Sequence, residues 1–275
     1  MSIQLQLETQ AVCNAACEFC PYPMQTRKKG RMSTVLYNKI VDEAAGIPLI
    51  THVCLNGLGE PMLDPQLVER VAYAHAAGKQ VFLFTNGTYL TPERFEALKA
   101  AGLATILVSL NASNAEERKR IMHLDDWDKV VGNILYAINH RGGVTLEVRA
   151  VVNDDSFGLE SARRLNALFG SVYDGGGYVR LIEEGNWAGA NRLIESRTFK
   201  PNEHCGRATG AIYVTWDGKV TTCCQDPFGD GNVFGDLNTQ TIREVYAAGP
   251  YESFRLDHLN NEADKHPICK DCGRM

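Results

Sequence analysis

The sequence lacks the features that suit a membrane or nucleic-acid partner. No apolar run approaches membrane-spanning length, and residues 2–8 alternate like a half-buried strand rather than forming a signal peptide. The 28 basic and 33 acidic residues give a net charge of −5, so there is no overall positive excess to attract nucleic acid. We therefore expect a cytoplasmic protein without a membrane or nucleic-acid partner.

Cysteine, by contrast, is abundant. The chain has 9 cysteines, and in a reducing compartment such residues are more often metal ligands than disulfide partners. Cys13, Cys17 and Cys20 share one short loop near the N-terminus. Three soft ligands on one loop suit an iron–sulfur cluster or zinc. The cluster is favoured, because no usual zinc partner follows at short range to complete a tetrahedron.

Short apolar strands alternate with helices over residues 1–182. Helix signals such as Asp64-Pro65 before Gly78, and Thr91-Pro92 before Gly102, separate the strands. This alternation predicts an α/β fold, a partial (β/α)6 TIM-like barrel with its working loops after the carboxyl ends of the strands. The predicted strands are 3–8, 49–55, 80–85, 104–110, 145–152 and 178–182, and the helices 33–45, 64–78, 91–102, 126–139 and 159–169.

A different composition follows the barrel. Residues 183–204 resemble a connector, and the domain predicted for residues 205–275 contains five of the nine cysteines. An Asp-Gly turn predicts a hairpin of residues 212–215 and 220–223, and residues 241–248 are expected to be helical. Because this domain is too small and polar for a large core of its own, we expect a bound metal centre to hold it together.

Small and polar residues follow the predicted barrel strands. Gly57 and Gly59 would let the backbone approach a ligand closely, and Glu60, before Pro61, could accept hydrogen bonds from an ammonium group. Asn86 follows the third strand. Ser109 and Asn111 end the fourth strand, where a spacing of two predicts that they point the same way. The glycine loop is equally consistent with a tight turn, and singly each of the polar residues after the strands is more often an ordinary turn residue than a binding residue.

Arg149 lies within a strand that helices are expected to bury. A charged side chain there must face the barrel mouth or be paired. It could hold a ligand carboxylate or a substrate oxygen, or it could form an internal ion pair with Glu147.

Together these features resemble the radical S-adenosylmethionine (SAM) superfamily. The match is Cys13-x3-Cys17-x2-Cys20 with Phe19 before the last cysteine, followed by residues 57–61 and 109–111. The resemblance implies a 4Fe–4S cluster on the three cysteines, with SAM chelating the open iron. Reductive cleavage of SAM would give a 5′-deoxyadenosyl radical that abstracts hydrogen, with an electron donor such as flavodoxin or ferredoxin. The implied cofactor-binding residues are Phe19, Gly57, Gly59, Glu60, Pro61, Asn86, Ser109 and Asn111.

The C-terminal cysteines resemble the SPASM auxiliary-cluster extension, in its shorter "twitch" form with one extra cluster. The resemblance implies a second 4Fe–4S cluster, and Cys224 could replace Cys223 as a ligand. A zinc ribbon is the alternative, with His204 or His266 as substitute ligands. The implied cluster ligands are Cys205, Cys223, Cys269 and Cys272.

The same resemblance suggests a function. The chain resembles twitch-type dehydrogenases of the 2-deoxy-scyllo-inosamine dehydrogenase type. This resemblance implies a small-molecule substrate and a two-electron oxidation of a sugar or cyclitol alcohol. One alternative is a radical epimerase of a sugar or peptide residue, in which Cys224 donates the hydrogen atom. The other is a non-catalytic zinc-binding module.

Overall fold

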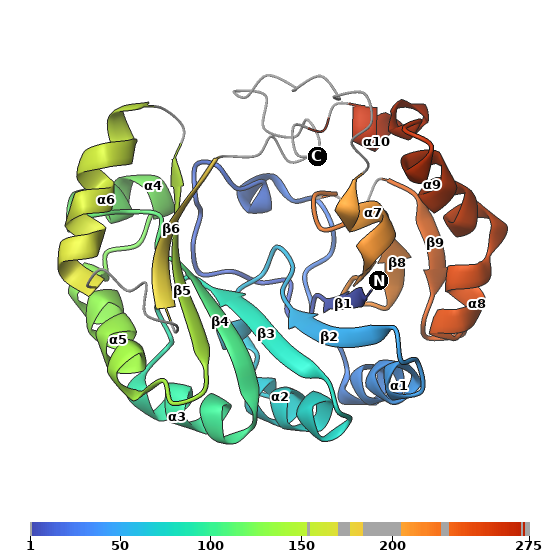
Figure 1. Cartoon of the computed structure of the whole chain (residues 1–275), viewed down its shortest axis with the longest axis horizontal. Coiled ribbons are helices and arrows are strands. Elements are labelled where there is room, and N and C mark those ends of the chain that lie inside the picture. Colours follow the sequence, from blue (N-terminus) through green and yellow to red (C-terminus); the bar gives the residue numbers. More distant parts are fainter. Residues whose placement is uncertain are drawn as a thin grey trace.

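Six parallel strands form the open barrel that the sequence predicts. The computed structural model describes residues 2–152, 155–169, 177–183, 205–226, 231–270 and 272. The strands are β1 (Ile3–Leu7), β2 (Ile50–Leu55), β3 (Gln80–Thr85), β4 (Leu103–Ser109), β5 (Thr145–Val152) and β6 (Gly177–Glu183). Each pairs in parallel with the next, and the sheet curves around a concave interior (Figure 1). The predicted partial barrel is therefore confirmed.

Helices cover the outer face of this sheet (Figure 1). They are α1 (Thr34–Ala45), α2 (Leu67–Ala76), α3 (Pro92–Ala100), α4 (Ala115–Met122), α5 (Trp127–His140) and α6 (Asp155–Phe169), with short 3₁₀ helices η1 (Tyr22–Met24) and η2 (Pro61–Leu63). The Ser33 and Thr91 side chains cap α1 and α3 by accepting bonds from backbone N–H groups three residues on. The sequence analysis missed α4, and α6 begins four residues before the predicted start at 159.

The predicted start of α2 at Asp64-Pro65 is wrong. The chain first makes η2, and the helix begins at Leu67. Asp64 accepts a hydrogen bond from the Gln66 N–H at 3.0 Å and pairs with the Arg70 guanidinium at 2.8 Å, both charges being buried. The Asp64 carboxylate therefore stabilises the turn before the helix and forms an ion pair with Arg70. It does not cap the first turn of the helix.

The C-terminal segment extends the barrel sheet. It contains α7 (Gly206–Gly210), β7 (Ala211–Val214), β8 (Lys219–Thr221), β9 (Val233–Asp236), α8 (Ile242–Ala247), α9 (Gly249–Leu259), η3 (Ala263–Lys265) and α10 (Pro267–Lys270). The predicted β7–β8 hairpin is present, and Gly218 takes φ 91° in its turn. β7 pairs in parallel with β1, which gives the strand order β6-β5-β4-β3-β2-β1-β7-β8-β9. Neither β9 nor α9 was predicted.

This pairing changes how the C-terminal segment is stabilised. Ile212, Val214, Val220 and Tyr251 belong to the same hydrophobic cluster as the barrel residues. The segment therefore shares the barrel core, so packing against the barrel stabilises it in addition to the metal centre that the sequence analysis expected. Residues 184–204, nearly all of the predicted connector, lie outside the described residues. The domain boundaries at 182 and 204 stay a prediction.

Side-chain alternation gives the barrel a polar and aromatic interior. Val53 and Leu55 of β2 join the hydrophobic cluster beneath the helices, whereas Cys54 between them does not. Cys54 is in register with Gln6 on β1 and Phe82 on β3. Because successive strand residues face opposite sides, these three side chains share the inner face. Cys54 is fully buried on this concave side. Among the described residues, no helix is both long and apolar enough to cross a bilayer.

Candidate functional site

The loop that holds Cys13, Cys17 and Cys20 lies beyond the carboxyl end of β1 and contacts α4. The Ala16 and Glu18 N–H groups donate to the carbonyls of Met122 and Ile121 at 3.2 and 2.9 Å. Within the loop, the Cys20 N–H donates to the Cys17 carbonyl at 3.0 Å, and the Ala15 N–H donates to Cys13 Sγ at 3.4 Å. The end of α4 therefore helps to shape the cysteine loop.

The three thiols lie in surroundings that oppose thiolate formation without a cation. Burial raises the pKa of Cys13 to about 12 and that of Cys20 to about 11. Burial also raises the pKa of Cys17, and the neighbouring Cys20 and Cys13 raise it further, which shows that the sulfurs are close. Metal ligation requires the thiolate form, so iron ions would supply the missing positive charge. The loop therefore fits a three-cysteine cluster.

Glu60 connects the loop after β2 to the end of β3. Its carboxylate is 3% exposed and accepts bonds from the Met62 N–H at 3.0 Å, the Thr85 hydroxyl at 2.7 Å and the Asn86 N–H at 2.7 Å. Burial raises the pKa of Glu60, although the bonds from Asn86, Met62 and Thr85 act to lower it. The carboxylate is thus already used within the protein, and the backbone of the loop is the more accessible acceptor for an amine.

Gly57 and Gly59 are required by close packing inside the chain. A Cβ on Gly59 would lie 1.9 Å from the Gln10 carbonyl oxygen, and one on Gly57 would lie 2.4 Å from the Glu8 side chain. The Glu60 N–H donates to the Val12 carbonyl at 2.9 Å in the same contact. These glycines therefore bring the loop after β2 against the segment that leads into Cys13.

Gly59→Ala should destabilise the protein by about 1–3 kcal/mol, because the new methyl must push two backbone segments apart. Gly132→Ala is the matched control. Gly132 lies exposed within α5, a Cβ there meets nothing within 4 Å, and alanine should stabilise the helix by about 0.5–1 kcal/mol. Chemical denaturation of the three proteins measures both effects. Equal stability of Gly59→Ala and the unchanged protein would contradict the packing argument.

The other predicted cofactor residues gather near the ends of β3 and β4. The Asn86 Nδ2 donates to Asn14 of the cysteine loop at 2.8 Å. Ser109 is the last residue of β4 and is in register with Arg149. Asn111 lies beyond the strand with φ 53°, so the argument that it shares the direction of Ser109 by strand alternation is wrong. Pro61 begins η2, and Phe19 lies half-buried in the cysteine loop.

Arg118 on α4 is the main residue that the sequence analysis missed. Its fully buried side chain donates to the carbonyls of Asn86 at 3.1 Å and Leu110 at 3.2 Å, and pairs with Asp126 at 2.5 Å. It therefore ties together the residues that follow β3 and β4, and its charge acts against the burial that raises the pKa of Cys17. The spacing Asn114-x-x-Glu117, with the Asn114 side chain accepting from the Glu117 N–H, is a helix-start signal that could have revealed α4.

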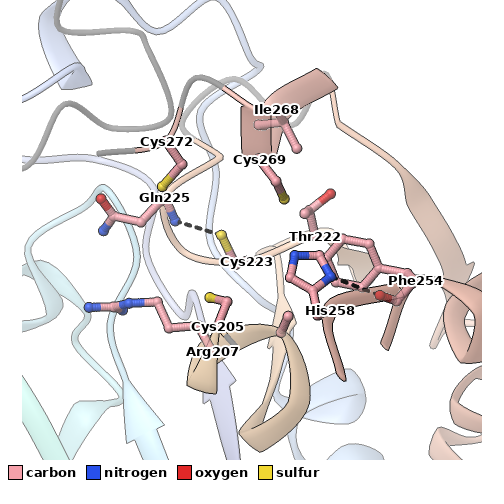
Figure 2. A pocket seen from close by; sticks show the side chains of 11 residues that line it. Cys205, Arg207, Thr222, Cys223, Gln225, Phe254, His258, Ile268, Cys269 and Cys272 are labelled. Atoms are coloured by element: carbon pink, nitrogen blue, oxygen red, sulfur yellow. Dashed lines mark hydrogen bonds between the residues drawn. The ribbon is translucent and has the colours of Figure 1, made fainter. Parts of the chain in front are cut away.

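A second cysteine site lies in the C-terminal segment (Figure 2). Its four thiols come from the residue before α7, the loop after β8, α10 and the chain just beyond it. They line one cavity. The Gln225 N–H donates to Cys223 Sγ at 3.3 Å, and N–H···S bonds of this kind tune iron–sulfur clusters. The four cysteines are Cys205, Cys223, Cys269 and Cys272.

Some buried polar atoms in the lining of this cavity have no hydrogen-bond partner among the described residues. Among the residues that line it, the Thr222 hydroxyl, the Gln225 side-chain amide oxygen and the His258 Nε2 are buried without a hydrogen-bond partner. The His258 Nδ1 lies 2.8 Å from the Phe254 carbonyl oxygen, to which it can only donate, while the other ring nitrogen faces the cavity (Figure 2). Each buried unpaired polar group costs about 1–3 kcal/mol. Of these three atoms the Thr222 hydroxyl can donate to a cluster sulfide, whereas the Gln225 amide oxygen and the His258 Nε2 are acceptors that a cluster does not satisfy. The cavity fits a cluster with four cysteine ligands.

Two observations bear on the alternatives left open by the sequence. Cys223 lines the cavity, whereas Cys224 does not and accepts a hydrogen bond from Arg207 at 2.8 Å. A zinc ion needs ligand atoms about 2.0–2.3 Å from one point, and no three suitable side chains in the described part of the chain form such a group. A four-iron cluster is larger than one ion and requires more widely spaced sulfurs.

Arg149 forms the internal ion pair with Glu147 that the sequence allowed. Its Nε donates to the Glu147 carboxylate, and its guanidinium lies 5.0 Å from the centre of the Phe84 ring. Glu147 is buried, whereas the Arg149 side chain is 21% exposed. The pair therefore faces the barrel interior with the arginine toward solvent.

Family comparisons agree with this arrangement. Residues 7–152 match the radical SAM superfamily, and residues 205–273 match SPASM, an iron–sulfur cluster-binding domain. The chain belongs to the radical SAM superfamily. It is therefore an enzyme whose cofactors are SAM and 4Fe–4S clusters. The radical SAM region binds SAM and one cluster, and the SPASM region binds additional iron–sulfur.

Individual relatives match this chain along nearly its whole length. The S-adenosyl-L-methionine-dependent 2-deoxy-scyllo-inosamine dehydrogenase of Niallia circulans is 21% identical over 98% of this chain and 92% of its own length. A cofactor-modifying protein for tungsten-containing aldehyde ferredoxin oxidoreductase, from Pyrococcus furiosus, is 31% identical over 98% and 86%. The crystal structure of BtrN with AdoMet and 2-DOIA has a TM-score of 0.71 at 19% identity, covering 100% of this chain and 94% of that one.

Proposed function

We propose that this enzyme oxidises an alcohol of a small molecule, such as a sugar or cyclitol, by removing two electrons. The observation that carries the proposal is the cavity with four cysteines, which the β1–β7 pairing attaches directly to the barrel. Oxidation of a carbinol releases one hydrogen atom, one proton and one electron. A second redox centre beside the barrel would suit the acceptance of that electron. Similarity to a dehydrogenase along 98% of the chain supports the same class.

The barrel residues would bind and orient the cofactor. When bound on Cys13, Cys17 and Cys20, the cluster and SAM would supply a 5′-deoxyadenosyl radical that abstracts hydrogen. The backbone at Gly57 and Gly59 would accept from the methionyl amine, since the Glu60 carboxylate already has three donors. Phe19, Pro61, Asn86, Ser109 and Asn111 would line the remainder of the SAM site. A flavodoxin or ferredoxin in the cytoplasm would serve as electron donor.

The test is anaerobic turnover of the reconstituted enzyme against a panel of sugars and cyclitols in deuterated water. Oxidation should give equal amounts of 5′-deoxyadenosine and oxidised product, with no solvent deuterium in the product. Deuterium in an unoxidised product would instead support epimerisation. Zinc in place of iron, with no 5′-deoxyadenosine, would leave only a zinc-binding module.

Epimerisation of a sugar or peptide residue is the second candidate. One observation favours it: the Cys224 sulfur does not line the cavity of the four thiols and is bonded to the exposed Arg207. A thiol outside the ligand set is the type of group that can donate a hydrogen atom to a substrate radical.

A further inference from the structure

Glu8, the residue after β1, carries a buried carboxylate that is not assigned to either cluster or to SAM. Its side chain is 0% exposed. One carboxylate oxygen accepts from Arg27 Nη2 at 2.9 Å and from the Leu58 N–H at 3.3 Å. The other accepts from Arg27 Nη1 at 3.0 Å and from the Trp216 N–H at 3.3 Å. Four donors therefore converge on two oxygens, and only a group that accepts on both sides fits between them.

These donors come from three parts of the chain that are far apart in the sequence. Arg27 lies in the segment that follows the cysteine loop, and Leu58 lies in the loop after β2 that is predicted to bind SAM. Trp216 lies in the turn between β7 and β8, within the C-terminal segment. One carboxylate therefore links the predicted SAM loop both to the segment after the cysteine loop and to the C-terminal segment.

Close packing leaves these segments little freedom to move independently of Glu8. A Cβ on Gly57 would lie 2.4 Å from Glu8 Cγ, so the loop after β2 rests directly on this side chain. A Cβ on Gly30 would lie 2.5 Å from the Trp216 ring, and the Trp216 Nε1 donates to the Lys28 carbonyl at 3.0 Å. A change in the position of the carboxylate must therefore be transmitted to the backbone of residues 57–59.

We propose that Glu8 is a positioning residue for SAM. Its carboxylate, held by Arg27, fixes the Leu58 N–H and with it the backbone that would accept from the methionyl amine. This inference rests on the proposed function, which puts the amine at that backbone. It also gives the C-terminal segment a part in SAM binding, because the Trp216 N–H donates to the same carboxylate.

Glu8→Gln tests this role with almost no change of shape. One of the two acceptor atoms becomes an N–H donor that faces other donors, so the amide satisfies either the Leu58 side or the Trp216 side, but not both. Anaerobic calorimetry of the reconstituted enzyme, without substrate, should show SAM affinity lowered about tenfold or more. Electron paramagnetic resonance of the reduced barrel cluster should be unchanged without SAM and should respond only at correspondingly higher SAM concentrations.

Two further variants separate position from stability. Ile134→Val shortens a fully buried side chain on α5, far along the chain from Glu8, and should leave SAM affinity unchanged although it lowers stability. Arg27→Lys keeps the charge that balances Glu8 but loses the two parallel hydrogen bonds of the guanidinium. It should lower SAM affinity by about threefold to tenfold, and it decides the question if Glu8→Gln yields no folded protein.

Unchanged SAM affinity in folded Glu8→Gln, or in Arg27→Lys where the first variant does not fold, overturns the inference. Lower stability with full SAM affinity would make the carboxylate a structural group only. An equal loss of affinity in Ile134→Val would show that stability, and not position, governs SAM binding, which also overturns it. The proposed oxidation fails separately: an unchanged enzyme that binds SAM but oxidises no sugar or cyclitol would refute that function and leave the measured SAM affinities in place.

Discussion

Replacing Cys13, Cys17 and Cys20 together by alanine should lower the iron content from about eight to about four per chain. The remaining iron should belong to the auxiliary site, whose four cysteines are unchanged. SAM cleavage should disappear, because no cluster with an open iron is left in the barrel. Anaerobic reconstitution followed by iron and sulfide analysis measures the first effect, and 5′-deoxyadenosine production measures the second.

Cys54→Ala is the control for this triple change. Cys54 is buried on the inner face of β2, and neither cysteine site includes it, so the iron content should not change. Full retention of iron in the triple variant would contradict the assignment of the loop. Stoichiometric zinc in the unchanged protein would favour the zinc-binding module instead.

Cys223→Ala and Cys224→Ala should differ sharply although the residues are adjacent. Cys223 lines the cavity with the other three thiols, so its loss should reduce the iron to about four per chain while SAM cleavage persists. Cys224 is not among the lining residues and instead accepts a hydrogen bond from Arg207, so its replacement should leave about eight irons. Electron paramagnetic resonance of the reduced proteins counts the clusters. The opposite pattern would make Cys224 the ligand.

Local patterns in the sequence were enough to predict the barrel. Short apolar strands and helix caps such as Ser33 and Thr91 depend on residues only a few positions apart. The spacing of Cys13, Cys17 and Cys20 is equally local, because one short loop holds all three. Errors arose where tertiary contacts compete with a local signal. Asp64 resembled a helix cap, yet the buried Arg70 made it an ion-pair partner.

What the sequence determined by itself was the chemistry: thiol ligands, loop glycines, and strands in the order of a parallel barrel. Tertiary structure decided how these elements are used. The β1–β7 pairing joins residues more than 200 positions apart, and the cavity gathers Cys205, Cys223, Cys269 and Cys272 from separate elements. Arg118, Arg207 and Glu60 took on roles that only their distant partners define. Contacts over such separations depend on how the packed elements meet, and no short-range periodicity encodes them.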